Sequence, residues 1–149
     1  MIEKATIEDL DQIIKLKIRM FEDMGAKWLL AENAEDLILS RYREFYDQDT
    51  VQHFVIRDEG SIVSCAGGFI KDDPPYCFFT KPHYGFISDS YTLPAHRGKG
   101  YATMLTHEVI AWLKSKDINM IRLISSSEAR GIYERIGFRQ TDEMMLLTY

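Results

Sequence analysis

The stretch 93–102, LPAHRGKGYA, joins two segments of different periodicity and decides how the rest of the chain is organised. Before it, YGFISDSYTL (84–93) is predicted to be a strand that stops at a proline, which has no N–H for a sheet ladder. After it, apolar residues recur at helical spacing, which predicts a helix over 98–116. A helix N-terminus favours acidic residues by about 0.3–1 kcal/mol each. Arg97 and Lys99 carry the opposite charge.

A bound anion would resolve this conflict. The first turn of a helix has free N–H groups, and Gly98 and Gly100 would let a ligand approach them because glycine has no Cβ atom. A phosphate at this point would also attract the two cations. The alternative is a simple turn with solvated cations. The spacings of a Walker A loop and of a G-x-G-x-x-G dinucleotide site are both absent.

The pattern along the chain predicts one α/β (α+β) domain over 1–149. A short strand is followed by two helices and a hairpin, after which strands and helices alternate. The predicted ranges are 2–5 (strand), 10–25 and 30–45 (helices), 51–70 (hairpin), 84–93 (strand), 98–116 (helix), 118–124 (strand), 128–136 (helix) and 143–149 (strand). A strand, one long helix and a second strand imply a parallel pair with a right-handed crossover.

Bulk properties exclude several classes of protein. The net charge of −5 argues against a general nucleic-acid surface. No apolar stretch approaches the roughly 20 residues that span a bilayer, and the N-terminus lacks the pattern of a signal peptide. The cysteines and histidines show no metal-type spacing. We therefore expect a cytoplasmic protein without a metal or a membrane partner. A homodimer is possible, because the final strand could pair with a second copy.

Two motifs carry a resemblance to a known family. RGKGYA (97–102) matches the R/Q-x-x-G-x-G/A signature of the GCN5-related N-acetyltransferases (GNAT), and ARGIYERIGF (129–138) resembles their A-x-x-x-Y-E-K-x-G-F segment. The resemblance implies a mixed central sheet of six to seven strands flanked by about four helices. It also implies transfer of an acetyl group from acetyl-CoA to a primary amine of a small molecule or peptide, by direct attack in a ternary complex.

Two alternatives to this function stay open. One is a non-catalytic acyl-CoA-binding regulatory domain that keeps the phosphate loop. The other is a transferase that uses a different acyl-CoA, because nothing in the sequence defines an acyl pocket.

The resemblance further implies how acetyl-CoA would bind. Its pyrophosphate would contact the backbone amides that open the long helix, and its pantetheine arm would pair with the strand before them. The residues implied are Tyr91, Thr92, Arg97, Gly98, Lys99, Gly100, Tyr101, Ala102, Thr103 and Ser126. Ser126 stands where the family often has Asn, and it can still cap the following helix.

Two residues are candidates for catalysis. By the resemblance, Tyr133 would protonate or hydrogen-bond the departing thiolate; the alternative is that it only packs beside Phe138. Asp89 is the first candidate for the base that deprotonates the amine, since an acid inside an apolar-and-hydroxyl strand needs a partner or a purpose. Its alternative role is a hydrogen bond to a backbone N–H or a neighbouring serine. His53 and His83 are weaker candidates for the base.

An acceptor site for a cationic amine is also conceivable from the sequence. It would be acidic and lined by aromatic rings, whereas the alternative is a solvated face and loop. Its residues would be Glu22, Asp23, Asp72, Asp73, Tyr76 and Phe79.

Overall fold

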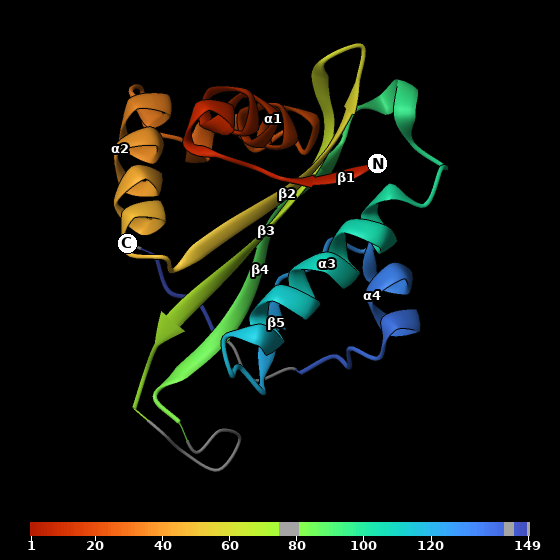
Figure 1. Cartoon of the computed structure of the whole chain (residues 1–149). Coiled ribbons are helices and arrows are strands. Elements are labelled where there is room, and N and C mark those ends of the chain that lie inside the picture. Colours follow the sequence, from red (N-terminus) through yellow and green to blue (C-terminus); the bar gives the residue numbers. More distant parts are fainter. Residues whose placement is uncertain (75–80, 142–144, 149) are drawn as a thin grey trace.

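The computed structural model describes residues 1–74, 81–141 and 145–148. The elements follow the predicted order through the last helix (Figure 1). They are β1 (Ile2–Lys4), α1 (Leu10–Asp23), α2 (Ala34–Asp47), β2 (Val51–Asp58), β3 (Ser61–Asp72), β4 (His83–Thr92), α3 (Tyr101–Ser115), β5 (Ile121–Leu123) and α4 (Arg130–Ile136), with short 3-10 turns between some of them. The four predicted α-helices are therefore confirmed.

The strands form one mixed sheet in the order β1-β2-β3-β4-β5. The first three pairs are antiparallel, and β4 and β5 are parallel because α3 crosses between them. The parallel unit is the one that the strand–helix–strand pattern predicts, and the α/β class is confirmed. This mixed sheet agrees with the GNAT-type arrangement that the resemblance implies, and the long helix α3 begins inside the 93–102 stretch, at Tyr101.

The expected six to seven strands were too many, since the described residues form five. The difference lies in the last predicted strand, 143–149. Residues 145–148 form no strand, and 142–144 and 149 lie outside the described residues. Met145 is 95% exposed. An apolar run becomes a strand only where another strand edge takes up its hydrogen bonds, and none does so for 145–148 within the described residues. The pairing of this segment with a second copy stays a prediction.

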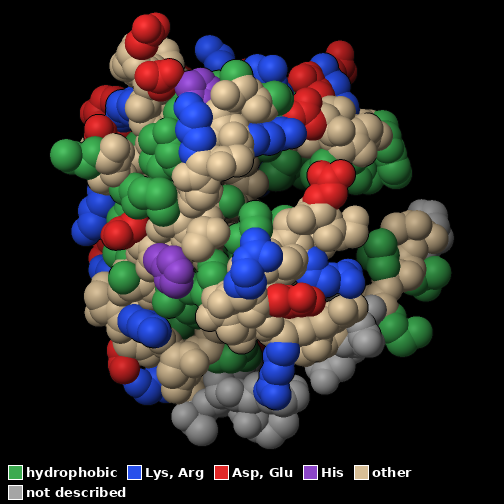
Figure 2. All heavy atoms as spheres, turned by 90° about the vertical axis from the view of Figure 1, so that its right-hand side faces the viewer, with side chains coloured by type: hydrophobic (Ala, Val, Ile, Leu, Met, Phe, Trp, Pro, Cys, Tyr) green, Lys and Arg blue, Asp and Glu red, His purple; other side chains and the backbone are tan. Residues whose placement is uncertain are grey.

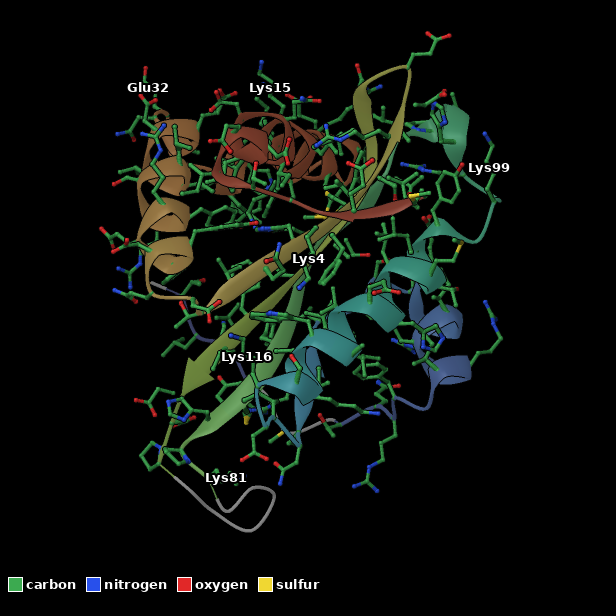
Figure 3. The ribbon with its side chains drawn as sticks, in the orientation of Figure 1. Lys4, Lys15, Glu32, Lys81, Lys99 and Lys116 are labelled. Atoms are coloured by element: carbon green, nitrogen blue, oxygen red, sulfur yellow. The ribbon has the colours of Figure 1, made fainter. Side chains whose placement is uncertain are left out.

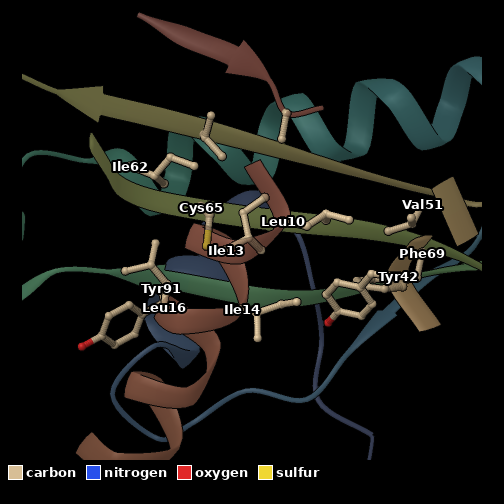
Figure 4. Close-up of a cluster of buried hydrophobic side chains, with 12 residues drawn as sticks. Leu10, Ile13, Ile14, Leu16, Tyr42, Val51, Ile62, Cys65, Phe69 and Tyr91 are labelled. Atoms are coloured by element: carbon tan, nitrogen blue, oxygen red, sulfur yellow. The ribbon is translucent and has the colours of Figure 1, made fainter. Parts of the chain in front are cut away.

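Helices cover both faces of the sheet (Figure 1). The α1–α2 face holds one core, in which α1 packs on the strands and Tyr42 lies against Phe69 (Figure 4). The α3 face holds the other core, centred on Leu105, Val109 and Leu113, which are all fully buried. This layering leaves β4 between the two helical layers, with α1 on one face and α3 on the other.

Candidate active site

The strands β4 and β5 separate part of the way along β4. They pair only between Gly85–Ile87 and Ile121–Leu123. Beyond Ile87, the edge of β4 that faces away from β3 has no strand partner within the described residues, as far as Thr92. A free strand edge offers N–H and C=O groups to an extended ligand. Thr92, which was predicted to line a pantetheine arm, lies on this free segment together with Tyr91.

A β-bulge interrupts β4 at the same place. The β3–β4 register shifts between Cys65 and Gly67, and Asp89 adopts a left-handed backbone with φ of 58°. Asp tolerates this conformation better than most residues. The bulge sends two successive side chains, those of Ser88 and Asp89, toward the α1–α2 face, where the two are hydrogen-bonded. An uninterrupted strand would have sent them to opposite faces.

Asp89 is the centre of a buried polar network. Its side chain is fully buried, and its Oδ1 accepts hydrogen bonds from the Lys17 ammonium and, at 3.3 Å, from Ser88 Oγ. Its Oδ2 accepts from Tyr42 Oη at 2.5 Å and lies 2.8 Å from His53 Nε2. Burial alone would raise the pKa of Asp89, but the His53 hydrogen bond and the Lys17 charge outweigh it and hold that pKa well below its usual range.

Tyr46 extends the network on the other side of His53. Tyr46 stacks on His53, and its hydroxyl lies 3.0 Å from His53 Nδ1. Burial raises the pKa of Tyr46 to about 12, so its hydroxyl keeps its proton at neutral pH. Both ring nitrogens of His53 are thus occupied and the residue is fully buried. The other histidine candidate, His83, is exposed at the far end of β4 from Asp89.

The loop before α3 has the geometry of an anion site. Gly98 and Gly100 have φ values of 78° and 77°, and an added Cβ would meet no atom within 4 Å at either residue. These left-handed glycines delay the helix, which begins at Tyr101 rather than at the expected Gly98. Within the described residues, no hydrogen bond takes up the N–H groups from Gly98 to Thr103. These six amides suit a phosphate group.

The two cations of this loop differ. Arg97 folds back, donating from Nε to Thr92 O at 3.0 Å and lying 3.4 Å from Asp23. Lys99 extends away from the body of the molecule (Figure 3) and has its ammonium 5.9 Å from the Tyr101 ring. The surface on this side mixes Lys and Arg with Asp and Glu (Figure 2). Any attraction for phosphate is therefore local to the loop.

Tyr133 lies on α4, where its ring packs edge-on against Phe138 at 5.9 Å. The packing against Phe138 that the sequence offered as the alternative is therefore present. The ring is buried, while the hydroxyl has no hydrogen-bond partner within the described residues and is not among the buried unsatisfied groups. It is therefore open to solvent or ligand. Ser126 Oγ accepts a hydrogen bond from the N–H of Ala129, the N-cap residue of α4, at 3.2 Å, so Ser126 stabilises the turn before the helix.

The acidic acceptor cluster is not assembled. Asp23 lies at the end of β4 that holds Tyr91, to which it is hydrogen-bonded. Asp72 pairs with His83 at the opposite end of β4, and Glu22 forms an ion pair with Lys27. Tyr76 and Phe79 lie outside the described residues. The length of β4 separates these acids and all of them are exposed, so the interpretation as a solvated face and loop holds for them.

Among residues 1–74, 81–141 and 145–148, none of the helices has the length and apolar character needed to span a membrane. No group of three His, Cys, Asp or Glu side chains in the same residues is placed to hold a metal ion.

Solved structures share the fold over almost the whole chain. A predicted acetyltransferase with acetyl-CoA from Clostridium acetobutylicum has a TM-score of 0.89 at 23% identity, covering 99% of this chain and 95% of that one. A GCN5-related N-acetyltransferase from Ralstonia eutropha JMP134 has a TM-score of 0.89 at 20% identity, covering 99% and 97%. An aminoglycoside antibiotic 6'-N-acetyltransferase from Acinetobacter haemolyticus has a TM-score of 0.75 at 17% identity, covering 100% and 97%.

Sequence comparison supplies the assignment to a family. The comparison with curated proteins gives no match. The sequence model of the acetyltransferase (GNAT) family matches residues 17–138, which include the 93–102 stretch, the free edge of β4 and Tyr133. Because that match spans most of the chain, this protein belongs to the acetyltransferase (GNAT) family.

Proposed function

We propose that this acetyltransferase binds acetyl-CoA and transfers the acetyl group to a primary amine by direct attack in a ternary complex. The observation that carries the proposal is the row of unpaired amides from Gly98 to Thr103, which stands at the end of the free edge of β4. A diphosphate fits the first feature and an extended arm with amide groups fits the second. Both features belong to one continuous segment, 88–103.

Different parts of the proposed site would bind different parts of the cofactor. The backbone at Gly98, Gly100 and the first turn of α3 would hold the pyrophosphate, and Lys99 is the cation free to approach it. Tyr91 and Thr92 would pair through their backbone groups. Arg97 would fix the loop to the end of β4, since it is already bonded to the Thr92 carbonyl. The remaining predicted contacts are the amides of Tyr101, Ala102 and Thr103 and the capping residue Ser126.

Bound acetyl-CoA would supply an activated acetyl thioester, and the chain would stabilise the sulfur that leaves. The Tyr133 hydroxyl suits this role because no other group in the described residues occupies it. A phenol pKa near 10 against a thiol pKa near 8.5 makes full proton transfer uphill by roughly 2 kcal/mol. A hydrogen bond from Tyr133 would therefore stabilise the thiolate without full transfer of the proton.

Asp89 fits a supporting role better than that of a base. Both of its oxygens are occupied, its side chain is fully buried, and its lowered pKa makes it a weak proton acceptor. We propose that it holds Lys17 and ties α1 and α2 to the bulge of β4. The amine would then lose its proton to water at the edge of the site.

Tyr133→Phe should lower kcat by about 10-fold or more. A 10-fold loss lies below the usual effect of a positioned proton donor, and a larger loss falls within it. The Michaelis constant for acetyl-CoA and the melting temperature should stay nearly unchanged, because the lost hydroxyl has no partner in the described residues. Steady-state kinetics with saturating amine would measure the first effect, and thermal unfolding the second. An unchanged kcat would leave Tyr133 with a packing role only.

A further inference from the structure

A cavity lies on the α1–α2 face of the sheet beside the Asp89 network. Its volume is about 230 Å³, and it is lined by Lys17, Tyr42, Phe45, Thr50, Phe69, Ile70, Lys71, Phe86 and Ser88. Three of these residues, Lys17, Tyr42 and Ser88, are also partners of Asp89. Ser88 directly follows Ile87, where the pairing of β4 with β5 ends. The cavity therefore reaches the free segment of β4.

The walls of the cavity are aromatic. Tyr42 lies 5.7 Å from Phe69 and 6.5 Å from Phe45, measured between ring centroids, and Phe86 supplies a fourth ring. The volume is below the roughly 300–1,000 Å³ of a pocket for a drug-sized ligand. It suits one ring or one aliphatic side chain, and it is too small for an oligosaccharide.

The only ionic side chains that line the cavity are two lysines, and no carboxylate lines it within the described residues. Lys17 is 17% exposed and gives one hydrogen bond to Asp89, which leaves two of its three N–H donors for a ligand. The Lys71 ammonium stands 4.2 Å from the Phe86 ring centroid, and no ion pair to it is found in the described residues. The charge of Lys71 is thus not neutralised.

We propose that this cavity selects an acceptor amine that carries both a carboxylate and one apolar or aromatic side group, as an amino acid does. This inference rests on the proposed function. The carboxylate would bond to Lys71 and to the free donors of Lys17, while the side group would pack against the rings. Because the amine and the carboxylate of an α-amino acid share one carbon, the amine would lie near Ser88, where β4 and β5 separate.

The same charges disfavour a polycation. The Lys71 ammonium repels a ligand that brings further ammonium groups, while the charge of Lys17 is balanced by Asp89. The aminoglycoside acetyltransferase of A. haemolyticus shares the fold at 17% identity. Its acceptor class does not match the charge of this cavity.

Three acceptors have the same ring: phenylalanine, its neutral amide and phenethylamine, which has no carboxylate. Comparing them separates the contribution of the carboxylate from that of the ring. We expect kcat/KM for phenylalanine to exceed that for phenethylamine by about 10-fold or more, as for a charge-assisted hydrogen bond. The amide should fall between them or match phenethylamine. Formation of the N-acetyl product by mass spectrometry measures all three.

Lys71→Met should remove most of this preference, measured as the ratio of kcat/KM for phenylalanine to kcat/KM for phenethylamine. Lys4→Met is the matched control, because Lys4 is an exposed lysine on a strand of the same sheet and does not line the cavity. It should keep the full preference. Retention of the preference in Lys71→Met would overturn the assignment of Lys71.

The outcomes separate this inference from the proposed function. If amines are acetylated but the carboxylate gives no advantage, or polyamines are preferred, the cavity has been assigned wrongly and the proposed function stands. If no amine is acetylated, the proposed function fails. Calorimetric titration of phenylalanine and phenethylamine into the wild type and Lys71→Met then tests the cavity alone. Equal affinities for the two ligands in the wild type would overturn it.

Discussion

Gly100→Asp should remove about two thirds or more of the rise in melting temperature that acetyl-CoA produces in the native chain. A ligand at 100 times its dissociation constant stabilises a folded protein by about 2.7 kcal/mol, so the native shift should be several degrees. The new carboxylate would stand directly before the first turn of α3, at the amides proposed for the pyrophosphate. We expect like-charge repulsion of about 2 kcal/mol or more, which weakens binding by about 30-fold.

The matched control for this variant is Gly60→Asp. Gly60 has φ of 82° in the turn between β2 and β3, and an added Cβ there would also meet no atom within 4 Å. Both variants therefore carry the same backbone strain, at most about 1–2 kcal/mol, and the same new charge. Gly60→Asp should melt lower than the native chain but keep the acetyl-CoA shift. If acetyl-CoA raises the melting temperature equally in the two variants, the loop before α3 is not part of the cofactor site.

Asp89→Asn should lower the free energy of unfolding by about 3 kcal/mol, the cost of removing one partner from a buried ion pair. Asn also tolerates the left-handed backbone of this residue, so the variant changes the charge with little added strain. The loss arises because Lys17 no longer has its anion and the Tyr42 hydroxyl loses a charged acceptor. Urea unfolding at pH 7 measures it.

The contribution of Asp89 to the free energy of unfolding depends on pH. The folded-state pKa of Asp89 lies below its unfolded value of about 3.9, so its contribution is complete above that value and is lost as the pH falls through the lowered pKa. The difference in stability between the native chain and Asp89→Asn should therefore stay constant above about pH 4 and narrow below it. A difference that does not depend on pH would contradict the ionised state of Asp89.

The control for this pair is Asp117→Asn. Asp117 also has a left-handed backbone, with φ of 61°, and it pairs with a lysine, but its side chain is 84% exposed. Its replacement should change stability by less than about 0.5 kcal/mol. A loss as large as that of Asp89→Asn would mean that backbone conformation, rather than burial of the charge, determines the effect.

Local sequence patterns predicted the order of the elements through α4 and the position of the loop that opens α3. The strand, the two glycines and the amphipathic helix are adjacent in the chain, so local propensity determines them. The error in the start of α3 has the same local cause, since both glycines take left-handed conformations that a helix cannot include. The prediction of a strand was wrong for residues 145–148, because an apolar run does not reveal whether a partner edge is available to it.

The partners of Asp89 could not be found from its neighbours in the chain. Lys17 is 72 residues away and Tyr42 is 47 away. One signal was present: Lys17 follows Ile13 by four residues and Ile14 by three, so it lies on the apolar stripe of α1. A lysine at such a position needs a buried anion. The bulge that turns Asp89 toward it had no visible signal, because Ser-Asp-Ser does not reveal which face each side chain takes.

Incubation of the chain with acetyl-CoA and a panel of amines, with free thiol and N-acetyl product measured together, tests the proposed acetyl transfer. We expect thiol release that depends on the amine, an equal amount of N-acetyl product, and a marked decrease of both in Gly100→Asp but not in Gly60→Asp. If acetyl-CoA raises the melting temperature and yet no amine in the panel releases thiol, the chain binds the cofactor without catalysing transfer, and the proposed function is contradicted.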